Sequence, residues 1–311
     1  MSFYVIEPQV VEPADVLEHS VEALDPTPAW SVGEWTNGAL CHRPATRQVY
    51  RRVGAGVDTA DTPPEASPDT WQKLRVCSKY AAFEYYESTP TVQADGQPLR
   101  IVLQPRRRVD TVGLYGLRGQ LARITVRHGG QVLFGPAERS LQRRDVLGWY
   151  DWFTASFLQQ GAIVWINIPP VSGVQIEIEI LPVSGQASVQ YIVLGRGEWL
   201  GDMEWNPDID SSNFSQIERE FDGSLRPGVS LVRRRTVPRF AGSFIVPASN
   251  VDRVRGVRDR LNGMPALWIG LATQPDSPYY LSLLLFGLYR RLTYSPDSIH
   301  EAPAKIEIEE L

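Results

Sequence analysis

The chain has 311 residues, of which 43% are hydrophobic and 22% are charged. This length can supply two domains with separate cores, and the composition excludes a disordered chain. The formal net charge of −5 argues against a general nucleic-acid-binding protein, because such proteins normally carry a basic excess.

Cysteine and histidine usage limits the sites that the chain can form. Cys41 and Cys77 are its two cysteines, and neither they nor the four histidines show metal-ligand spacing. We therefore expect reduced thiols, no metal and no cofactor. The chain starts without a basic stretch followed by a long apolar run, and no window reaches the roughly 20 apolar residues that a bilayer span requires. We expect neither secretion nor membrane insertion.

Residues 1–92 show little periodicity and are predicted to form an extended N-terminal arm followed by an irregular, aromatic-rich segment. Prolines at positions 8, 13, 26 and 28 prevent a long helix, and residues 54–68 read as a polar loop. We expect the first thirty residues to be buried mostly against another subunit and to be mobile in the isolated chain. The later part carries many rings: Trp30, Trp35, Tyr50, Trp71, Tyr80, Phe83, Tyr85 and Tyr86.

Residues 93–184 contain short strand-like runs separated by Gly, Pro and Asp. Ile176, Ile178 and Ile180 alternate with two glutamates, which places one face in a core and the other in water. The glycines in the sequence HGGQ at 128–131 suit a tight hairpin turn. Several such strands without helices predict a β-sandwich of the jelly-roll kind.

Residues 185–311 are predicted to form an α+β module. A helix is expected between Asn250 and Gly263, because a capping residue precedes an apolar stripe at helical spacing and a glycine follows it. The continuous apolar run LSLLLFGLY at 281–289 indicates a central strand. The alternating run KIEIEEL at 305–311 is expected to lie nearer a sheet edge. The fold class is therefore mainly β, with a sandwich, a following α+β module and an extended arm.

An aromatic cluster within residues 145–157 is the candidate contact site. Its rings lie so close together in the sequence that a regular element would leave at least one exposed. The rings and the neighbouring carboxylates could bind a sugar. Alternatively, the cluster could plug one end of the sandwich or pack against a neighbouring chain. We favour these two structural roles over sugar binding. The candidate residues are Asp145, Trp149, Tyr150, Asp151, Trp152 and Phe153.

Catalytic patterns fail on inspection. The sequence DIDSSN at 208–213 starts like a calcium loop, but Asn213 stands where the turn needs Gly and Arg219 where a bidentate Glu is needed. The glycines of GRGEWLG at 195–201 have the wrong spacing for a phosphate-binding loop, and the chain has no nucleophile elbow. The sequence therefore predicts a protein that is not an enzyme.

Several composite motifs resemble those of a family of tailed-bacteriophage virion proteins, the minor tail proteins that contain a carbohydrate-binding domain. They are PDTWQKLRVCSKYAAFEYY at 68–86, LYGL at 114–117, GWYDWF at 148–153, INIPP at 166–170, YIVLGRGEWLGDMEW at 191–205 and RRRTVPRFAGSFIV at 233–246 with WIG at 268–270. The resemblance covers roughly residues 45–311. It departs from the family pattern at Ser78-Lys79, where an Asn-Arg pair is usual, and at Glu84, where an Asp is usual.

This resemblance implies a structural component near the tail tip, baseplate or collar, made in the bacterial host cytoplasm and present in the virion tail. Its expected partners are copies of itself in a ring and neighbouring tail or baseplate proteins. It carries over no catalytic residue. The alternative is a carbohydrate-binding module that contacts the host surface through residues 145–157. In a tail, we expect the acidic rows to face a channel or solvent; these rows are Glu177 with Glu179, and Glu307 with Glu309 and Glu310.

Overall fold

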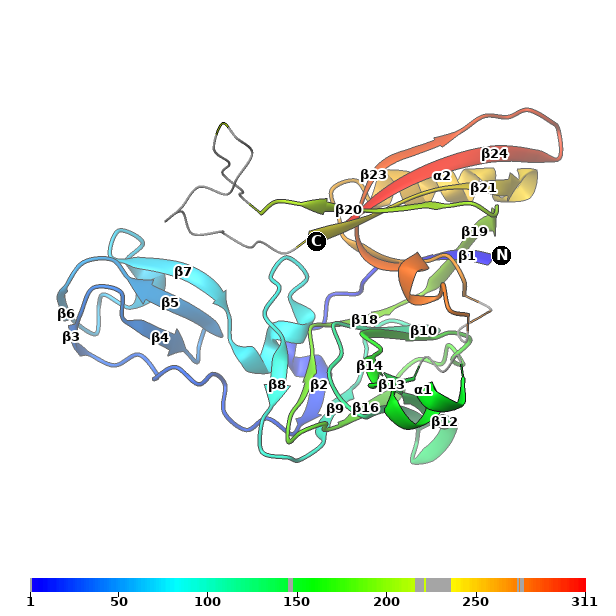
Figure 1. The fold of residues 1–311 in the computed structure, drawn as a ribbon. Helices are drawn as coiled ribbons and strands as arrows, with labels where there is room; N and C mark the ends of the chain where they lie inside the picture. The colour runs from blue at the N-terminus through cyan, green and yellow to red at the C-terminus, as the bar shows by residue number, and fades with distance from the viewer. Residues whose placement is uncertain (1, 145–147, 216–220, 222–235, 273, 275–276) are drawn as a thin grey trace. The chain divides into compact units, whose positions relative to one another are not determined.

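The computed structural model describes residues 2–144, 148–215, 221, 236–272, 274 and 277–311. It is mainly β, with 48% strand and 12% helix in several antiparallel sheets, which confirms the fold class expected from the sequence. The chain divides into two compact units, Pro8–Arg196 and Met1–Glu7 with Gly197–Leu311 (Figure 1). The chain therefore starts one unit, builds the whole of the other, and returns to complete the first. The division differs from the boundaries at 93 and 184 that the sequence suggested.

The unit Pro8–Arg196 is built around a β-sandwich. A five-stranded sheet, in the order β12-β11-β16-β9-β2, and a three-stranded sheet, in the order β15-β10-β18, contribute to one apolar cluster. Ile124 and Ile178 come from the first sheet and Leu114 from the second, and all three are buried. The strands are β2 (Val16–His19), β9 (Leu99–Leu103), β10 (Thr111–Tyr115), β11 (Leu121–His128), β12 (Gln131–Ser140), β15 (Ala162–Trp165), β16 (Gln175–Leu181) and β18 (Tyr191–Gly195).

Two local expectations for the sandwich are confirmed. His128 pairs with Gln131 across a two-residue turn, and Gly129 and Gly130 have φ values of 56° and 82°, which glycine adopts without steric cost. The isoleucines of β16 are buried, and the glutamates between them lie on the other face of the sheet. The period of two in the sequence therefore places both faces of this strand correctly.

Residues 29–76 form small sheets with a core of their own, which the sequence did not predict. Cys41, Tyr50 and Trp71 are buried together, with Trp30 and Trp35 packed against them. The strands have three to six residues each, too few to show a clear period in the sequence. They are β3 (Gly33–Trp35), β4 (Leu40–Arg43), β5 (Gln48–Arg52), β6 (Gly56–Asp58) and β7 (Trp71–Val76).

Short elements complete this unit. Strand β8 pairs with β17, and β13 pairs with β14. The remaining bounds are β8 (Thr91–Gln93), β13 (Gln142–Arg143), β14 (Leu158–Gln159), β17 (Ala187–Val189), the helix α1 (Trp149–Thr154) and the 3-10 helices η1 (Pro13–Asp15), η2 (Pro64–Ala66) and η3 (Ser78–Phe83).

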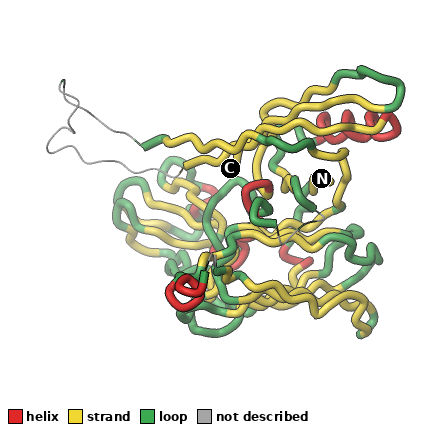
Figure 2. The backbone as a smooth tube through the Cα atoms, turned by 45° about the vertical axis from the view of Figure 1, so that its right-hand side comes forward, coloured by secondary structure: helices red, strands yellow, loops and turns green. Residues whose placement is uncertain are grey.

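The other unit is a seven-stranded sheet in the order β19-β1-β22-β23-β24-β21-β20. Strand β21 also pairs with β19, through Asp202 with Ile245 and Met203 with Phe244, so six of the strands close into a ring. Figure 2 shows these strands curving round on themselves. The elements are β1 (Ser2–Ile6), β19 (Gly197–Met203), β20 (Asp208–Asn213), β21 (Thr236–Pro247), η4 (Ala248–Asn250), α2 (Val251–Arg260), β22 (Ala266–Ile269), η5 (Leu281–Leu283), β23 (Leu284–Tyr294) and β24 (Glu301–Glu310).

The start of the chain is part of this ring, which corrects the expected role of the arm. Strand β1 lies between β19 and β22, and Phe3, Val5 and Ile6 are buried. The ring of Phe3 lies 5.1 Å from that of Phe244 and 6.1 Å from that of Trp268. A strand with partners on both sides belongs to the core of its own unit. Residues 2–6 are therefore not a segment that waits for another subunit.

Helix α2 begins and ends where the sequence predicts. Val254, Val257 and Leu261 form the buried stripe, and Gly263 follows with a φ of 73°, which suits the end of a helix. Asn250 stands at the N-cap position, but its side chain makes no capping hydrogen bond. It instead donates to the carbonyl oxygens of residues 199 and 200, at 2.7 and 3.1 Å, and so ties the start of the helix to β19.

Strand β24 is internal, so its expected place near an edge is wrong. It pairs with β23 on one side and β21 on the other. Ile306 and Ile308 are buried, whereas Lys305 and Glu307 are exposed. Alternation thus reports one solvent-facing side of a sheet, and it does not show whether the strand has one neighbour or two.

Candidate binding surfaces

The aromatic cluster is a loop held at its base by the sandwich. Strands β13 and β14 pair on either side of it, through Gln142 with Gln159 and Arg143 with Leu158. Below this pair Gln160 donates its N–H to the carbonyl oxygen of Leu141, which is fully buried in the core, at 2.7 Å. The loop is therefore attached to a packed sheet through its two ends.

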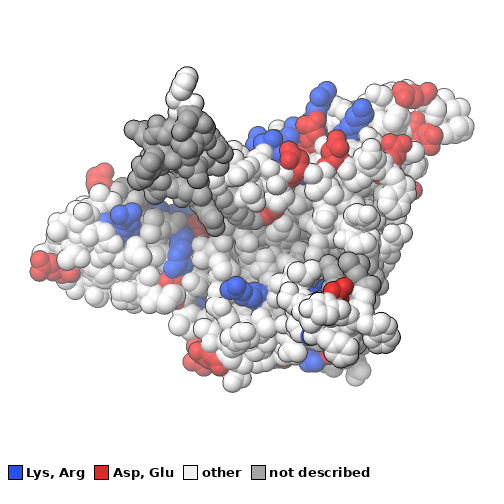
Figure 3. All heavy atoms as spheres, in the orientation of Figure 1, with Lys and Arg blue, Asp and Glu red and all other residues white. Residues whose placement is uncertain are grey.

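The rings of α1 point into solvent. The exposed fractions are 85% for Trp149, 78% for Tyr150, 60% for Trp152 and 78% for Phe153. These rings therefore do not plug the end of the sandwich. Figure 3 shows a surface of mostly uncharged residues where Figure 1 places α1. Asp151 lies in the same helix, and Asp145 lies outside the described residues.

The loop extends this apolar surface beyond α1. Phe157 and Leu158 are exposed, and the guanidinium of Arg144 lies 4.1 Å from the centre of the Phe157 ring. Arg144 also donates to the carbonyl oxygen of Trp152 at 3.1 Å, which links the two arms of the loop. We call the six exposed side chains of residues 149, 150, 152, 153, 157 and 158 the aromatic surface. A soluble protein rarely exposes so many large apolar side chains together unless the surface contacts something.

A second surface, which the sequence analysis did not identify, is a groove on the outer face of the five-stranded sheet. Its volume is about 330 Å³, and arginines of β11 face glutamates of β16 and β12 across it. The arginines are signalled in the sequence only by their spacing of two along a predicted strand. The lining residues are Arg123, Thr125, Arg127, Val132, Pro136, Glu138, Glu177 and Glu179.

Three glutamates of the acidic rows, Glu177, Glu179 and Glu309, pair with neighbouring arginines, so these three are not free charges. Glu177 pairs with Arg100 at 2.6 Å and with Arg127. The guanidinium of Arg100 helps to hold the pKa of Glu177 below its ordinary value, against the effect of burial. In the other unit Glu309 pairs with Arg290 at 2.6 Å, and this hydrogen bond lowers the pKa of Glu309.

That pair lines a wider hollow of about 790 Å³ over β20, β21, β23 and β24. Glu310, the last residue of the expected acidic row, is buried. Arg239 and Arg290 border the hollow together with Asp208 and Asp210, so its surface has mixed charge.

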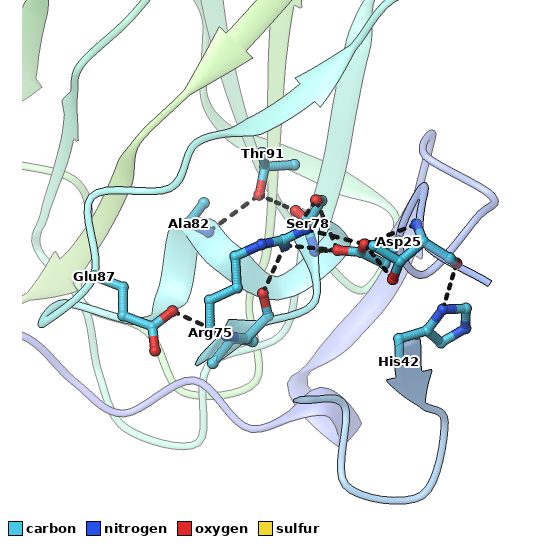
Figure 4. A network of polar contacts seen from close by, with 9 residues as sticks. Asp25, His42, Arg75, Ser78, Ala82, Glu87 and Thr91 are labelled. Carbon is cyan, nitrogen blue, oxygen red and sulfur yellow. Dashed lines mark hydrogen bonds and ion pairs between the residues drawn. The ribbon is translucent and has the colours of Figure 1, made fainter. Parts of the chain in front are cut away.

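A buried carboxylate, Asp25, organises a network of polar contacts (Figure 4). One oxygen accepts from Arg75 at 2.6 Å and from the N–H and hydroxyl of Ser78, each at 3.0 Å. The other accepts from the N–H of Thr27 at 3.0 Å. Burial by itself raises the pKa of Asp25, but the hydrogen bonds from Arg75, Thr27 and Ser78 outweigh it and lower the pKa to about 2.

This network joins distant parts of the chain. The hydroxyl of Thr91 donates to the carbonyl oxygen of Ser78 at 2.8 Å and accepts from the N–H of Ala82 at 3.1 Å. The Thr27 carbonyl oxygen lies 2.7 Å from Nδ1 of His42, on β4. Figure 4 shows that these groups point toward one another rather than into a cavity. The network holds the small sheets to the segment that follows them.

The thiols are buried and weakly acidic. Burial raises the pKa of Cys41 to about 12 and that of Cys77 to about 11, which makes both poor nucleophiles. Among the described residues, no group of three or more His, Cys, Asp or Glu is placed to hold a metal ion. No helix in the part of the chain that the structure describes is long and apolar enough to cross a membrane. Comparisons with protein-family models, with curated proteins and with solved structures gave no match.

Proposed function

We propose that this chain is a structural component of a tailed-phage virion, at the tail tip, baseplate or collar, and that it assembles with copies of itself and with neighbouring tail proteins. The observation that carries the proposal is the aromatic surface, which has four exposed rings on a loop held to the sandwich at both ends. Such a surface is stabilised when a partner removes it from water.

The chemistry of the aromatic surface suits a protein contact. Trp and Tyr provide large contact area with few torsions to order, and they are enriched among the residues that dominate binding energies. Burying one large apolar side chain contributes about 1.5–3 kcal/mol before the cost of association is subtracted. Six such side chains exceed what isolated exposed residues on a monomer would explain.

The same segment also supports the proposed context. The sequence GWYDWF at 148–153 is one of the motifs that resemble the virion-protein family, and it supplies the four rings of α1. A motif that carries a resemblance and lies exposed, away from any core, fits a role in assembly better than a role in folding.

Sedimentation velocity over a range of protein concentrations tests the proposal. We expect the full chain to form a larger species as concentration rises, and the variant Trp149→Ser/Trp152→Ser to remain monomeric with an unchanged circular dichroism spectrum. Trp205→Ser is the matched control, because this exposed indole lies outside the aromatic surface. A wild-type chain that stays monomeric throughout, or a double variant that associates like the wild type, would contradict assembly through this surface.

A second candidate function rests on the same rings. Exposed indole faces such as those of Trp149 and Trp152 can stack on the C–H face of a sugar, as in a module that contacts the host surface. Titration with host polysaccharide, followed by tryptophan fluorescence, tests this alternative. A spectrum that does not change at saturating polysaccharide would count against it.

A further inference from the structure

The chain contains the dipeptide Asn-Gly twice, at Asn37-Gly38 and at Asn262-Gly263. Each dipeptide forms the centre of a tight turn, because the residue after the glycine donates its N–H to the carbonyl oxygen of the residue before the asparagine, at 3.1 Å in both cases. The glycines have φ values of 81° and 73°, and both asparagines are exposed. The two sites therefore share their sequence, their type of turn and their exposure to water.

An asparagine followed by glycine can lose its side-chain amide without an enzyme. The backbone nitrogen of the glycine loses its proton to solvent base and attacks the side-chain carbonyl carbon, so that a new C–N bond closes a five-membered ring. The side-chain nitrogen takes up a proton and leaves as ammonia. Water then opens the ring at either of its carbonyl groups, which gives aspartate or isoaspartate. Glycine favours the attack because it has no Cβ beside the nitrogen.

The fold restrains both reacting groups of the first turn. The N–H of Gly38 donates to the carbonyl oxygen of Arg52, at the end of β5, at 2.9 Å. The side-chain Oδ1 of Asn37 accepts from the N–H of Gly54 at 3.0 Å. The nitrogen would have to leave Arg52, and the side chain would have to turn away from Gly54, before the two could meet. Two hydrogen bonds must therefore open before the ring can close.

The second turn has no such restraint. Neither the N–H of Gly263 nor the side chain of Asn262 makes a hydrogen bond within the described part of the chain. Apart from the adjoining residues, no heavy atom lies within 4 Å of the position that a Cβ of Gly263 would take. Solvent base can therefore reach the nitrogen, and the side chain is free to turn toward it.

We propose that Asn262 is a site of spontaneous deamidation, and that the fold protects Asn37 from the same reaction. The only reactant besides the chain is water. The product carries a new carboxylate just beyond the last residue of α2, Arg260, where the carbonyl end of the helix makes a negative charge unfavourable. In the isoaspartate product the main chain is also longer by one carbon, between the buried Leu261 and strand β22.

The hydrogen bonds of the first turn set the expected difference in rate. Each hydrogen bond that must open should slow ring closure by about 2- to 10-fold. Asn37 is held by two such bonds and Asn262 by none. In the folded chain we therefore expect Asn262 to react about 5- to 100-fold faster than Asn37. This modification does not depend on the proposed assembly.

The test follows both sites in the full chain during incubation at mildly alkaline pH in water labelled with heavy oxygen. Trypsin releases residues 1–47 and residues 261–290 as separate fragments, and each contains a single asparagine. Mass spectrometry of the two fragments measures the label that each takes up, and fragmentation assigns it to a residue. A parallel incubation in concentrated urea removes both turns, so the two sites should then react at similar rates.

Two variants make the assignment specific. Asn262→Gln keeps the amide but would require a six-membered ring, which closes far more slowly, so residues 261–290 should no longer take up label. Asn37→Gln is the matched control, because it makes the same change in the turn of the other unit. It should leave the labelling of residues 261–290 as it is in the wild type.

Three outcomes would overturn the proposal. The first is that the two asparagines react at the same rate in the folded chain, or that Asn37 reacts faster. The second is that the difference in rate persists in urea, since neighbouring residues rather than the fold would then be its cause. The third is that residues 261–290 still take up label in Asn262→Gln, which would assign the reaction to another side chain.

Discussion

Asp58 accepts a hydrogen bond of 2.8 Å from the indole of Trp71, and both side chains are buried in the core of the small sheets. The same carboxylate oxygen accepts from the indole of Trp30 at 3.1 Å, and the other oxygen pairs with Arg52 at 2.6 Å. The guanidinium of Arg52 also lies 5.2 Å from the centre of the Trp71 ring. One carboxylate thus satisfies three donors, and it links strands β5, β6 and β7 with the segment before β3.

The variant Asp58→Ala should destabilise the unit Pro8–Arg196 by about 3–5 kcal/mol, because it leaves the charge of Arg52 buried and unpaired. Two indole N–H groups would lose their acceptor as well. Urea unfolding followed by tryptophan fluorescence measures the change. Asp61→Ala, at an exposed position nearby, should stay within about 0.5 kcal/mol of the wild type. A loss below about 1 kcal/mol for Asp58→Ala would show that the ion pair is dispensable.

Asp25 predicts a loss of stability in acid. Its pKa of about 2 in the folded chain lies below the ordinary value of 3.8, so its contribution is complete above about pH 4 and disappears as the pH falls toward 2. The difference corresponds to about 2 kcal/mol. Asp25→Asn should therefore be less stable than the wild type at neutral pH, and the gap should close between pH 4 and 2. Parallel stability curves for the two proteins would rule out this role for the carboxylate.

The sequence predicted regular elements well where they were long. Helix α2 has an apolar stripe at helical spacing, formed by Val254, Val257 and Leu261, and Gly263 follows its last turn. The hydrophobic spacing and the end signal therefore predict the same helix. The isoleucines of β16, which recur at every second residue, predict a strand in the same way. Strand β1 could not be placed in this way, because its five residues are joined to partners nearly two hundred residues and more along the chain. Local pattern contains no information about such pairings.

The candidate sites were predictable to different degrees. The crowding of Trp149, Tyr150 and Trp152 in the sequence was enough to predict that a ring would be exposed, and the structure exposes all of them. The groove could not be predicted, because its arginines and glutamates meet only when β11 pairs with β16. Register also determines that Thr125 lies opposite Glu177, because a shift of one residue between the two strands would place an isoleucine of β16 there instead.

His19 gives a second dependence on pH, in a less acidic range than that of Asp25. Burial, with a smaller contribution from the charge of Lys79, lowers its pKa from 6.5 to about 4. Its Nδ1 accepts from the N–H of Val21 at 3.0 Å, so the folded chain holds the neutral ring. Stability from this group is complete above pH 6.5 and falls as the pH drops toward 4, because the unfolded chain takes up the proton first.

The variant His19→Asn tests this dependence, because an amide oxygen can still accept from the N–H of Val21. Its stability should change less than that of the wild type between pH 6.5 and 4, by about 2 kcal/mol. Thermal unfolding at several pH values measures the difference. His128→Asn, at the exposed hairpin turn, should follow the wild-type curve. Identical pH profiles for all three proteins would show that the His19 ring titrates normally.

The place of Phe3 in the ring of strands predicts that the start of the chain is needed for folding. Its side chain is fully buried against Phe244 and Trp268, so Phe3→Ala should cost about 3–5 kcal/mol through lost contacts and the cavity that remains. Val10→Ala is the control, because this side chain is exposed and should have little effect. Calorimetry should show a lowered transition for the unit that contains Gly197–Leu311, while the transition of Pro8–Arg196 stays in place. If Phe3→Ala leaves both transitions unchanged, β1 is not part of the core, and the first residues are free to contact another subunit.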